Sequence, residues 1–462
     1  MRVNRGVRRG GRNHWAIAIS TLAGLAAALS VAGSAQAAGP CAPGTRCLAV
    51  DDTGKPTPAG TYTAQCSGQF PDFVTPTTMI PAGGPWFKLA QNYPSTLPPD
   101  DAPWLKIDFR NGVQGADAYL YALRDYSFDG MIAADFRPQD NKVRPWFEMP
   151  MMNFRAGARE PTHGLTEERP VTGPELGLKP GVTVHNYAIG FYNAAGGYAI
   201  GQVWRSDNPK LRKSRFAQGA MTFKILFSDA TAEDFNGPDI LAGAPQWTIA
   251  TKSGLKKVRL IQMDVATVDR RSPTGWVFGT FAFDASATDP VAWNRLRPVG
   301  ISWGNDFGYT PADQKAGKKL TETTISEQIP AYAAAHLGWA GRTNGPVDNP
   351  ISGCLSCHGT AQYPVNADLA PFAASCDTDA KKMQWFRNLK PGEAFGSINK
   401  TTCTLEPLIP RPVTLDFSLQ MGVAVQAALQ FYDTNSCAPP TAAVRAAIRK
   451  VRGNISAAPI HR

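Results

Sequence analysis

The run Tyr187-Ala188-Ile189-Gly190-Phe191-Tyr192 has the aromatic and apolar character of a β-strand. A turn-rich stretch follows at residues 193–197, and a second apolar run comes after it, Tyr198-Ala199-Ile200-Gly201-Gln202-Val203-Trp204. Two short apolar runs separated by a few residues that include glycine are typical of a β-hairpin. We therefore expect residues 187–204 to form a hairpin within a β-rich region.

Short apolar segments bounded by Gly, Asn, Asp and Pro continue as far as residue 306. They lie at residues 221–227, 258–268, 276–283 and 299–303. This pattern predicts a mainly antiparallel β domain, built as a sandwich or as one curved sheet. Residues 104–109 and 119–123 also have strand character, so we assign residues 38–324 to this β-rich domain.

The pattern changes after residue 303. Residues 325–337, 377–389 and 415–432 are predicted to be helical, with Pro330 able to break the first of them and a proline-rich stretch before the last. These segments predict a small helical domain at residues 325–437, followed by a basic tail at 438–462. The expected fold class is α+β multidomain: a large, mainly antiparallel, sandwich-like β domain followed by a small α-helical domain.

The first 37 residues have the three parts of a secretory signal peptide. Five arginines precede an apolar stretch at residues 15–32, and Ala35-Gln36-Ala37 provides small residues for cleavage. The sequence therefore predicts that the mature chain begins after Ala37 and is periplasmic or secreted. No later stretch approaches 18 uninterrupted apolar residues, so we expect no transmembrane segment in the mature chain.

The charge of the chain argues against a nucleic-acid partner. The formal net charge is +10, but the five leader arginines supply half of it, and the remaining charge of about +5 is scattered. The segment 205–215 is locally basic. A solvated loop is the first interpretation of this segment, and a docking patch for an acidic redox partner is the second.

The motif Cys354-Leu355-Ser356-Cys357-His358 predicts a cofactor. Two cysteines separated by two residues and followed directly by histidine are typical of covalent haem attachment. In such a motif Cys354 and Cys357 bond the haem vinyl groups and His358 ligates the iron. We therefore expect one covalently attached haem c, with His358 as the proximal iron ligand, and electron transfer to a redox partner protein as its use.

The group on the other face of the iron would decide the function. Met383 and Met421 are the downstream methionines, and each is a candidate distal ligand for an electron carrier. His336 is a third candidate. The alternative function is a haem enzyme such as a peroxidase, with an open distal position and an acid/base residue such as His163 supplied by the β domain.

Six further cysteines form two sets of three. Cys41, Cys47 and Cys66 lie near the mature N-terminus, whereas the other three follow the haem motif: Cys376, Cys403 and Cys437. Export favours disulfides. Because each set is odd, full pairing requires at least one bridge between the sets, and we expect one, together with a local bridge from Cys41 to Cys47.

Residues 353–360 resemble the haem segment of c-type cytochromes. Over a longer span the chain is similar to a family of exported bacterial monohaem cytochrome c proteins with a large N-terminal region, through the segments 160–169, 274–281, 303–306, 344–350 and 415–420. The resemblance implies haem binding and electron transfer, and it implies no defined substrate.

Overall fold

The computed structural model describes residue 74 and residues 84–99, 101–152, 159–205, 209–251, 253–406 and 411–434. All of these residues belong to one compact unit, Ala37–Arg462, and the separate unit Met1–Gln36 lies outside them. The predicted signal peptide, the basic tail and the four cysteines at positions 41, 47, 66 and 437 also lie outside the described residues.

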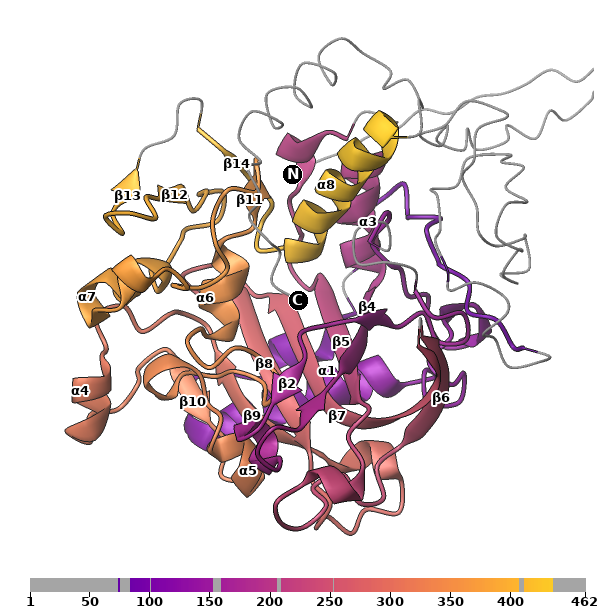
Figure 1. The fold of residues 1–462 in the computed structure, drawn as a ribbon. Helices are drawn as coiled ribbons and strands as arrows, with labels where there is room; N and C mark the ends of the chain where they lie inside the picture. The colour runs from indigo at the N-terminus through magenta and orange to yellow at the C-terminus, as the bar shows by residue number, and fades with distance from the viewer. Residues whose placement is uncertain are drawn as a thin grey trace, which may run out of the picture. The chain divides into compact units, whose positions relative to one another are not determined.

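One antiparallel sheet of eight strands forms the centre of the unit (Figure 1). Seven of the strands pair in a continuous path, and β6 (Gln246–Thr251) pairs separately with β7. In order across the sheet, the seven are β1 (Thr166–Glu167), β4 (Asn186–Tyr192), β5 (Met221–Ser228), β7 (Gly254–Val268), β8 (Trp276–Phe283), β9 (Leu296–Ser302) and β10 (Thr323–Ile325). The large antiparallel β region and the α+β class are thus confirmed. The sandwich is not: the other sheets among the described residues have two strands each.

Both faces of this sheet are buried. All eight residues of β8 are buried, and they alternate between two packing layers. Val277 and Phe281 face one layer, whereas Trp276 and Phe278 face the other. Complete burial of one such aromatic side chain contributes about 1.5 to 3 kcal/mol. A strand buried on both faces is apolar throughout, which explains why residues 276–283 show little polar alternation.

The layer that Val277 and Phe281 face contains a helix, α1, at the position where the sequence predicted a strand. α1 (Gly112–Phe128) packs against β9 and β10. Ala116, Leu120 and Leu123 are spaced by four and three residues and are buried on one side of this helix. Leu120 lies so close to Gly279 of β8 that a β-carbon there would collide with it. The strand predicted at 119–123 was wrong because five residues are too few to distinguish the two periods.

The predicted hairpin at 187–204 is half wrong. Its first half is β4, but its second half is the helix α3 (Ala194–Trp204). Asn193 caps this helix by accepting a hydrogen bond from Gly196 N at 2.9 Å. Because α3 is apolar on most sides and buried, its sequence has no polar face to reveal the helical period.

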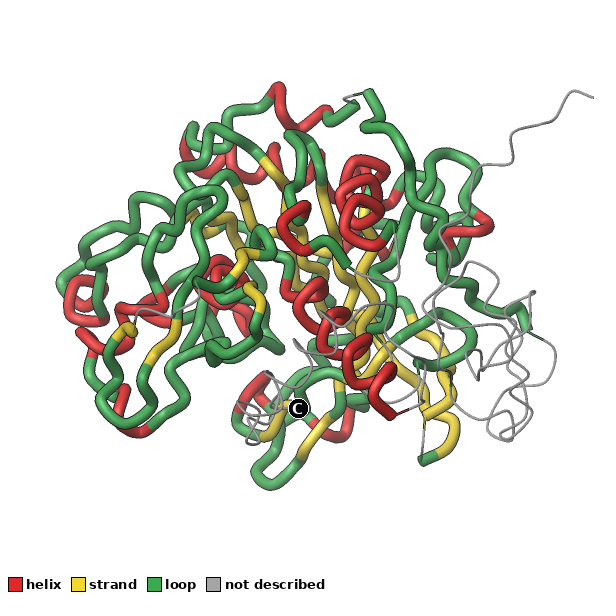
Figure 2. The backbone as a smooth tube through the Cα atoms, turned by 90° about the horizontal axis from the view of Figure 1, so that it is seen from above, coloured by secondary structure: helices red, strands yellow, loops and turns green. Residues whose placement is uncertain are grey.

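Outside the central sheet, much of the chain is loop with short helices (Figure 2). The C-terminal part, orange to yellow in Figure 1, is of this kind apart from one longer helix. The predicted helix 325–337 is reduced to α5 (Ala331–Ala334), which begins after Pro330, and the predicted helix 415–432 corresponds to α8 (Leu419–Thr434).

Several further short elements lie outside the central sheet. In chain order they are β2 (Val171–Thr172), β3 (Thr183–Val184), α4 (Pro311–Lys315), α6 (Cys354–Gly359), β11 (Gln362–Tyr363), α7 (Asp379–Lys382), the 3₁₀ helix η10 (Met383–Trp385), β12 (Ser397–Ile398), β13 (Leu405–Glu406) and β14 (Val413–Thr414).

The C-terminal part of the chain covers the second face of the sheet. α6 packs on β8, and Gln420 of α8 lies against Gly190 of β4. The boundary predicted between residues 324 and 325 falls inside β10, which pairs with β9. Because all described residues belong to one compact unit, the segment that carries the C-x-x-C-H motif is built onto the sheet.

Candidate haem-attachment site

The helix α6 holds the two thiols of the motif. Its first turn is closed by Ser356, whose hydroxyl donates to Gly353 O and accepts from Gly353 N, both at 2.9 Å. Cys354 and Cys357 are three residues apart and therefore lie on the same side of the helix. Both are half-buried and unpaired. Two neighbouring free thiols on one helical turn are the arrangement that two thioether bonds to one haem require.

His358 is oriented by a residue far along the chain. Its Nδ1 donates a hydrogen bond to the carbonyl oxygen of Phe417 at 2.9 Å, because a carbonyl oxygen can only accept. Its ring packs on Phe278 of β8, with 4.8 Å between the ring centroids. Burial lowers the pKa of His358 to about 4, so the imidazole is neutral at pH 7. The lone pair of Nε2 is then available to a metal, and the Nδ1 bond is the usual support of a histidine ligand.

A strained turn presents the carbonyl to His358. Asp416 and Phe417 have φ values of 53° and 63°, in the left-handed region that non-glycine residues rarely adopt. The carboxylate of Asp416 holds this turn by accepting from Phe216 N at 2.8 Å and from Trp276 Nε1 at 3.3 Å. Strain of about 1 to 3 kcal/mol at each such residue persists only where the surroundings enforce it, and it is concentrated at functional sites.

The donor set fits a covalently bound haem. Burial raises the pKa of Cys354 well above its usual value and that of Cys357 to about 12, so both are neutral thiols. Thioether formation would leave uncharged sulfur atoms, which suit a buried position. Among the described residues, no group of three or more His, Cys, Asp and Glu side chains is placed to hold a metal ion.

A polar row crosses the same face of the sheet. Lys224 of β5, Asp264 of β7 and Thr280 of β8 are cross-strand neighbours. Asp264 Oδ1 accepts hydrogen bonds from Thr280 Oγ1 at 2.7 Å and from Gln262 Nε2 at 2.8 Å, whereas its Oδ2 lies 3.8 Å from Lys224 Nζ. Gln262 also donates to Asp348 Oδ2 at 3.0 Å, which ties the loop before α6 to the sheet.

These charges influence one another and the motif. Burial and then Asp348 raise the pKa of Asp264 to about 7. Burial lowers the pKa of Lys224, but Glu168, Asp264 and Asp348 together outweigh this effect and place it above its usual value. Asp264 in turn contributes to the raised pKa of Cys354. The sequence alone did not identify the residues of this row as site residues. The one indication was Lys224, a charged residue inside the otherwise apolar segment 221–227.

Both candidate distal methionines are buried, and both sulfur atoms accept hydrogen bonds. Met383 Sδ accepts from Gly308 N and Met421 Sδ accepts from Trp204 Nε1, each at 3.2 Å. The 3₁₀ helix η10, which contains Met383, packs directly against α6. The choice between the two methionines therefore stays a prediction.

The structure places His163 away from the motif. Its ring stacks on Trp247 at 3.8 Å, and Trp247 stacks on Phe227, which points to the α1 side of the sheet. His163 is therefore not positioned to serve chemistry at α6. His336 is occupied as well, because its Nε2 accepts a hydrogen bond from Leu176 N at 2.8 Å.

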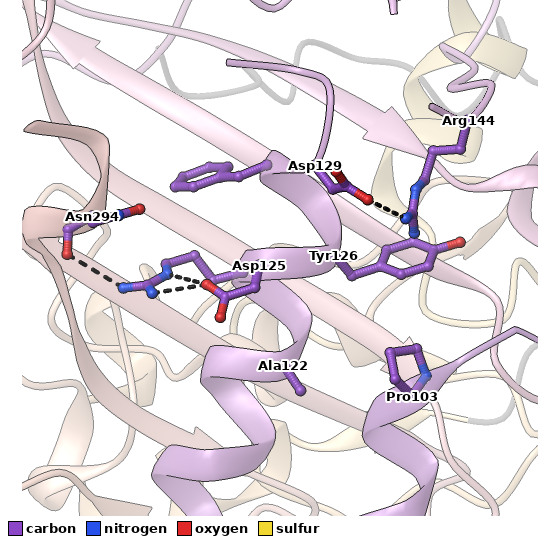
Figure 3. A pocket seen from close by; sticks show the side chains of 9 residues that line it. Pro103, Ala122, Asp125, Tyr126, Asp129, Arg144 and Asn294 are labelled. Atoms are coloured by element: carbon purple, nitrogen blue, oxygen red, sulfur yellow. Dashed lines mark hydrogen bonds and ion pairs between the residues drawn. The ribbon is translucent and has the colours of Figure 1, made fainter. Parts of the chain in front are cut away.

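A surface pocket of about 680 Å³ lies at α1 (Figure 3). Its charged walls are paired: Arg124 bonds Asp125 at 2.8 Å, and Arg144 bonds Asp129 at 2.7 Å. The Arg144 guanidinium also lies 3.7 Å from the centre of the Tyr126 ring. This pocket is on the α1 side of the sheet, as His163 is, and it takes no part in the motif.

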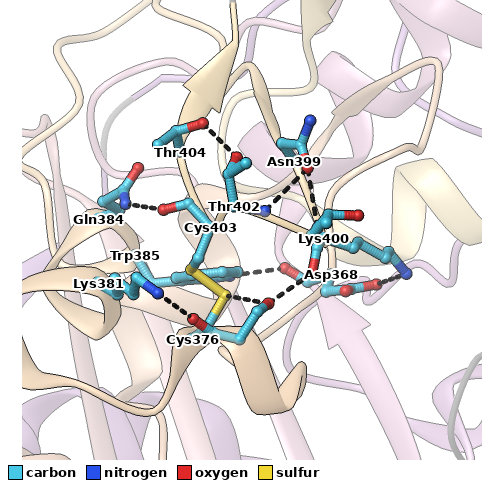
Figure 4. Close-up of a disulfide and its surroundings, with 12 residues drawn as sticks. Asp368, Cys376, Lys381, Gln384, Trp385, Asn399, Lys400, Thr402, Cys403 and Thr404 are labelled. Atoms are coloured by element: carbon cyan, nitrogen blue, oxygen red, sulfur yellow. Dashed lines mark hydrogen bonds and ion pairs between the residues drawn. A yellow bond between two sulfur atoms is a disulfide. The ribbon is translucent and has the colours of Figure 1, made fainter.

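One disulfide joins Cys376 to Cys403, 27 residues apart (Figure 4). Figure 4 shows Trp385 beside it, with its indole nitrogen donating to Asp368 O at 2.9 Å. The bridge lies within the C-terminal set of cysteines, so Cys437 is left without a partner from that set. A bridge between the two sets stays a prediction, because its cysteines lie outside the described residues.

No family model matches the chain, and neither the curated proteins nor the solved structures contain a significant match. In the part of the chain that the structure describes, every helix is too short or too polar to cross a bilayer.

Proposed function

We propose that this protein is an exported c-type cytochrome that carries one haem c and transfers electrons. The observation that carries the proposal is the arrangement of α6: two free thiols on one turn, followed by an imidazole whose Nδ1 is bonded to Phe417 O. Its Nε2 makes no hydrogen bond to another described residue. The bound haem would supply reversible one-electron chemistry at its iron. His358 would be the proximal ligand and Cys354 and Cys357 the attachment points. The proposed compartment is the periplasm or the exterior.

Haem attachment has a direct test that does not depend on activity. The protein is produced in a host that matures cytochromes c, and haem is detected by its visible spectrum and by the mass of the denatured chain. We expect the mass of one haem to remain after denaturation, and to be lost when both Cys354 and Cys357 are changed to serine. A chain that exported normally but carried no haem would remove the proposal.

A haem enzyme, such as a peroxidase, is the second candidate. One observation favours it: Lys224 and Asp264 of the polar row lie on the face of the sheet that α6 covers. These two side chains could supply the acid/base chemistry for which His163 is too far away. Asp264 Oδ1 is fixed by two hydrogen bonds, whereas Oδ2 has only the distant lysine as a partner among the described residues. This leaves one oriented carboxylate oxygen to exchange a proton.

The ferric spectrum of the holoprotein distinguishes the two candidates. An electron carrier is expected to show the charge-transfer band of iron bonded to methionine sulfur and to react slowly with hydrogen peroxide. A high-spin spectrum together with rapid peroxide consumption would favour the enzyme, provided that the peroxide consumption is lost in Asp264→Asn.

A further inference from the structure

A basic segment lies directly beside the support of His358. The short 3₁₀ helix η5 (Leu211–Lys213) packs against β14, which ends two residues before Asp416. Lys210, Arg212, Lys213 and Arg215 are exposed, and none of the four forms an ion pair with another described residue. We call these four residues the basic segment.

The basic segment is connected to the proposed iron ligand by two hydrogen bonds. The backbone N–H of Phe216, the residue after Arg215, donates to Asp416 Oδ2 at 2.8 Å. The next residue, Phe417, accepts from His358 Nδ1 at 2.9 Å through its carbonyl. The path from an exposed cation to the imidazole thus runs through covalent bonds and only two short hydrogen bonds.

Aromatic rings fill the space along the same route. The rings of Phe216 and Trp276 are 5.4 Å apart, those of Trp276 and Phe278 are 6.0 Å apart, and that of Phe278 is 4.8 Å from His358. These ring contacts form a continuous packed route from Phe216 to His358. The surface beside Phe216 is therefore a place where an electron could enter or leave.

The charge of this surface indicates the partner. Four cations within six residues create a positive potential that attracts an acidic protein and orients it during encounter. Glu393 lies in the loop that Arg215 contacts, but its carboxylate accepts a hydrogen bond from Lys390 N at 3.0 Å. The net charge of this part of the surface therefore stays positive.

We infer that the basic segment Lys210–Arg215 is the docking surface for an acidic redox protein, which exchanges one electron with the haem through Phe216, Asp416 and His358. In the reducing direction, the partner loses one electron and the ferric iron gains it. No atom is transferred. This inference deepens the proposed function and rests on it.

The test uses the holoprotein with its haem reduced, and two small oxidants of opposite charge. Oxidation by anionic ferricyanide and by cationic tris(phenanthroline)cobalt(III) is followed by stopped flow at low ionic strength. Arg212→Glu together with Lys213→Glu is compared with the matched control Lys142→Glu together with Lys257→Glu. The control residues are exposed, and Lys257 lies near the opposite end of β7 from Val268. The N–H of Val268 donates to Ala220 O and its carbonyl accepts from Gly219 N, so this far end of β7 lies beside residues close to Phe216 in the chain.

We expect the Arg212/Lys213 variant to react with ferricyanide about tenfold more slowly and with the cobalt complex faster, because steering of this kind changes rates by about 10-fold or more. Poly-L-glutamate should slow the ferricyanide reaction of the natural protein and have little effect on this variant. The control should change both rates much less.

Equal changes in the two double variants would overturn the inference, because they would show an effect of total charge alone. The same conclusion would follow if poly-L-glutamate slowed the natural protein and the Arg212/Lys213 variant equally. Failure of the proposed function is separate from either result: it would appear as a protein without covalent haem, before any rate is measured.

Discussion

His358 Nδ1 lies 2.9 Å from the carbonyl oxygen of Phe417, a residue 59 positions further along the chain. This bond determines which imidazole nitrogen carries the proton, so it also determines which nitrogen is left for a metal. The carbonyl is in place because Asp416 and Phe417 both adopt left-handed backbone angles. The C-x-x-C-H motif therefore depends on a turn that lies outside it.

The turn should weaken when its tryptophan donor is removed. Trp276→Phe keeps an aromatic ring but leaves Asp416 Oδ1 without the indole N–H in a buried site. We expect a loss of about 1 to 3 kcal/mol in the free energy of unfolding, measured by urea denaturation, and a shifted haem spectrum. Trp293→Phe, in the other layer of the sheet, is the control and should leave the spectrum unchanged.

The distal ligand can be identified by comparing two substitutions. In the proposed electron carrier, Met383→Ala and Met421→Ala should differ, because only loss of a methionine that bonds iron would abolish the charge-transfer band of iron bonded to sulfur. The other substitution should only lower stability, by about 2 to 5 kcal/mol for a buried methionine. If both variants keep the band, neither methionine is the ligand.

Asp264 should make stability fall as the pH rises. Its folded-state pKa of about 7 lies above the unfolded value of about 3.9, so the folded protein holds this proton more tightly. The stabilisation is complete below about pH 4 and is lost as the pH rises to about 7. Between these limits the natural protein should lose about 2 kcal/mol or more relative to Asp264→Asn. Parallel stability curves for the two proteins would contradict the raised pKa.

Arg342 should be a major contributor to the stability of the loops around the motif. Its guanidinium donates to four carbonyl oxygens, those of Asn305, Asp306, Tyr309 and Trp339, at 2.8 to 3.0 Å. Arg342→Lys keeps the charge but cannot reproduce this fork, so we expect a loss of about 2 to 4 kcal/mol in urea denaturation. Arg110→Lys, at an exposed ion pair, is the control and should leave the urea denaturation curve almost unchanged.

The disulfide pattern can be checked by peptide mapping without reduction. The bridge Cys376–Cys403 should be found, and replacing both cysteines by serine should cost about 2 to 4 kcal/mol. Because this bridge uses two of the three C-terminal cysteines and a local bridge is expected between Cys41 and Cys47, Cys437 should be joined to Cys66. A free thiol at Cys437 would contradict the predicted link between the two sets.

The amino-acid sequence by itself was sufficient for the motif and for three of the central strands. Residues 221–227, 258–268 and 276–283 are apolar, short and bounded by turn residues, and each became a strand of the sheet. The C-x-x-C-H spacing also needs no tertiary information, because two cysteines three positions apart share one side of a helical turn wherever that helix lies. By contrast, α1 was missed because the five residues 119–123 are too few to distinguish a strand from a helix, and α3 because a helix that is apolar on most sides lacks the polar face that reveals its period.

Only the tertiary structure decided what surrounds the motif. The Phe417 carbonyl, the Asp416 carboxylate and the Lys224–Asp264 pair come from segments far apart in the chain, and strand register and loop packing bring them to one face of the sheet. The same packing sent His163 to the opposite face, although its sequence neighbours are as polar as those of a site residue. Local spacing determines which atoms can bond a haem, whereas long-range packing determines which groups lie beside it, because a one-residue difference in strand position reverses the face of a side chain.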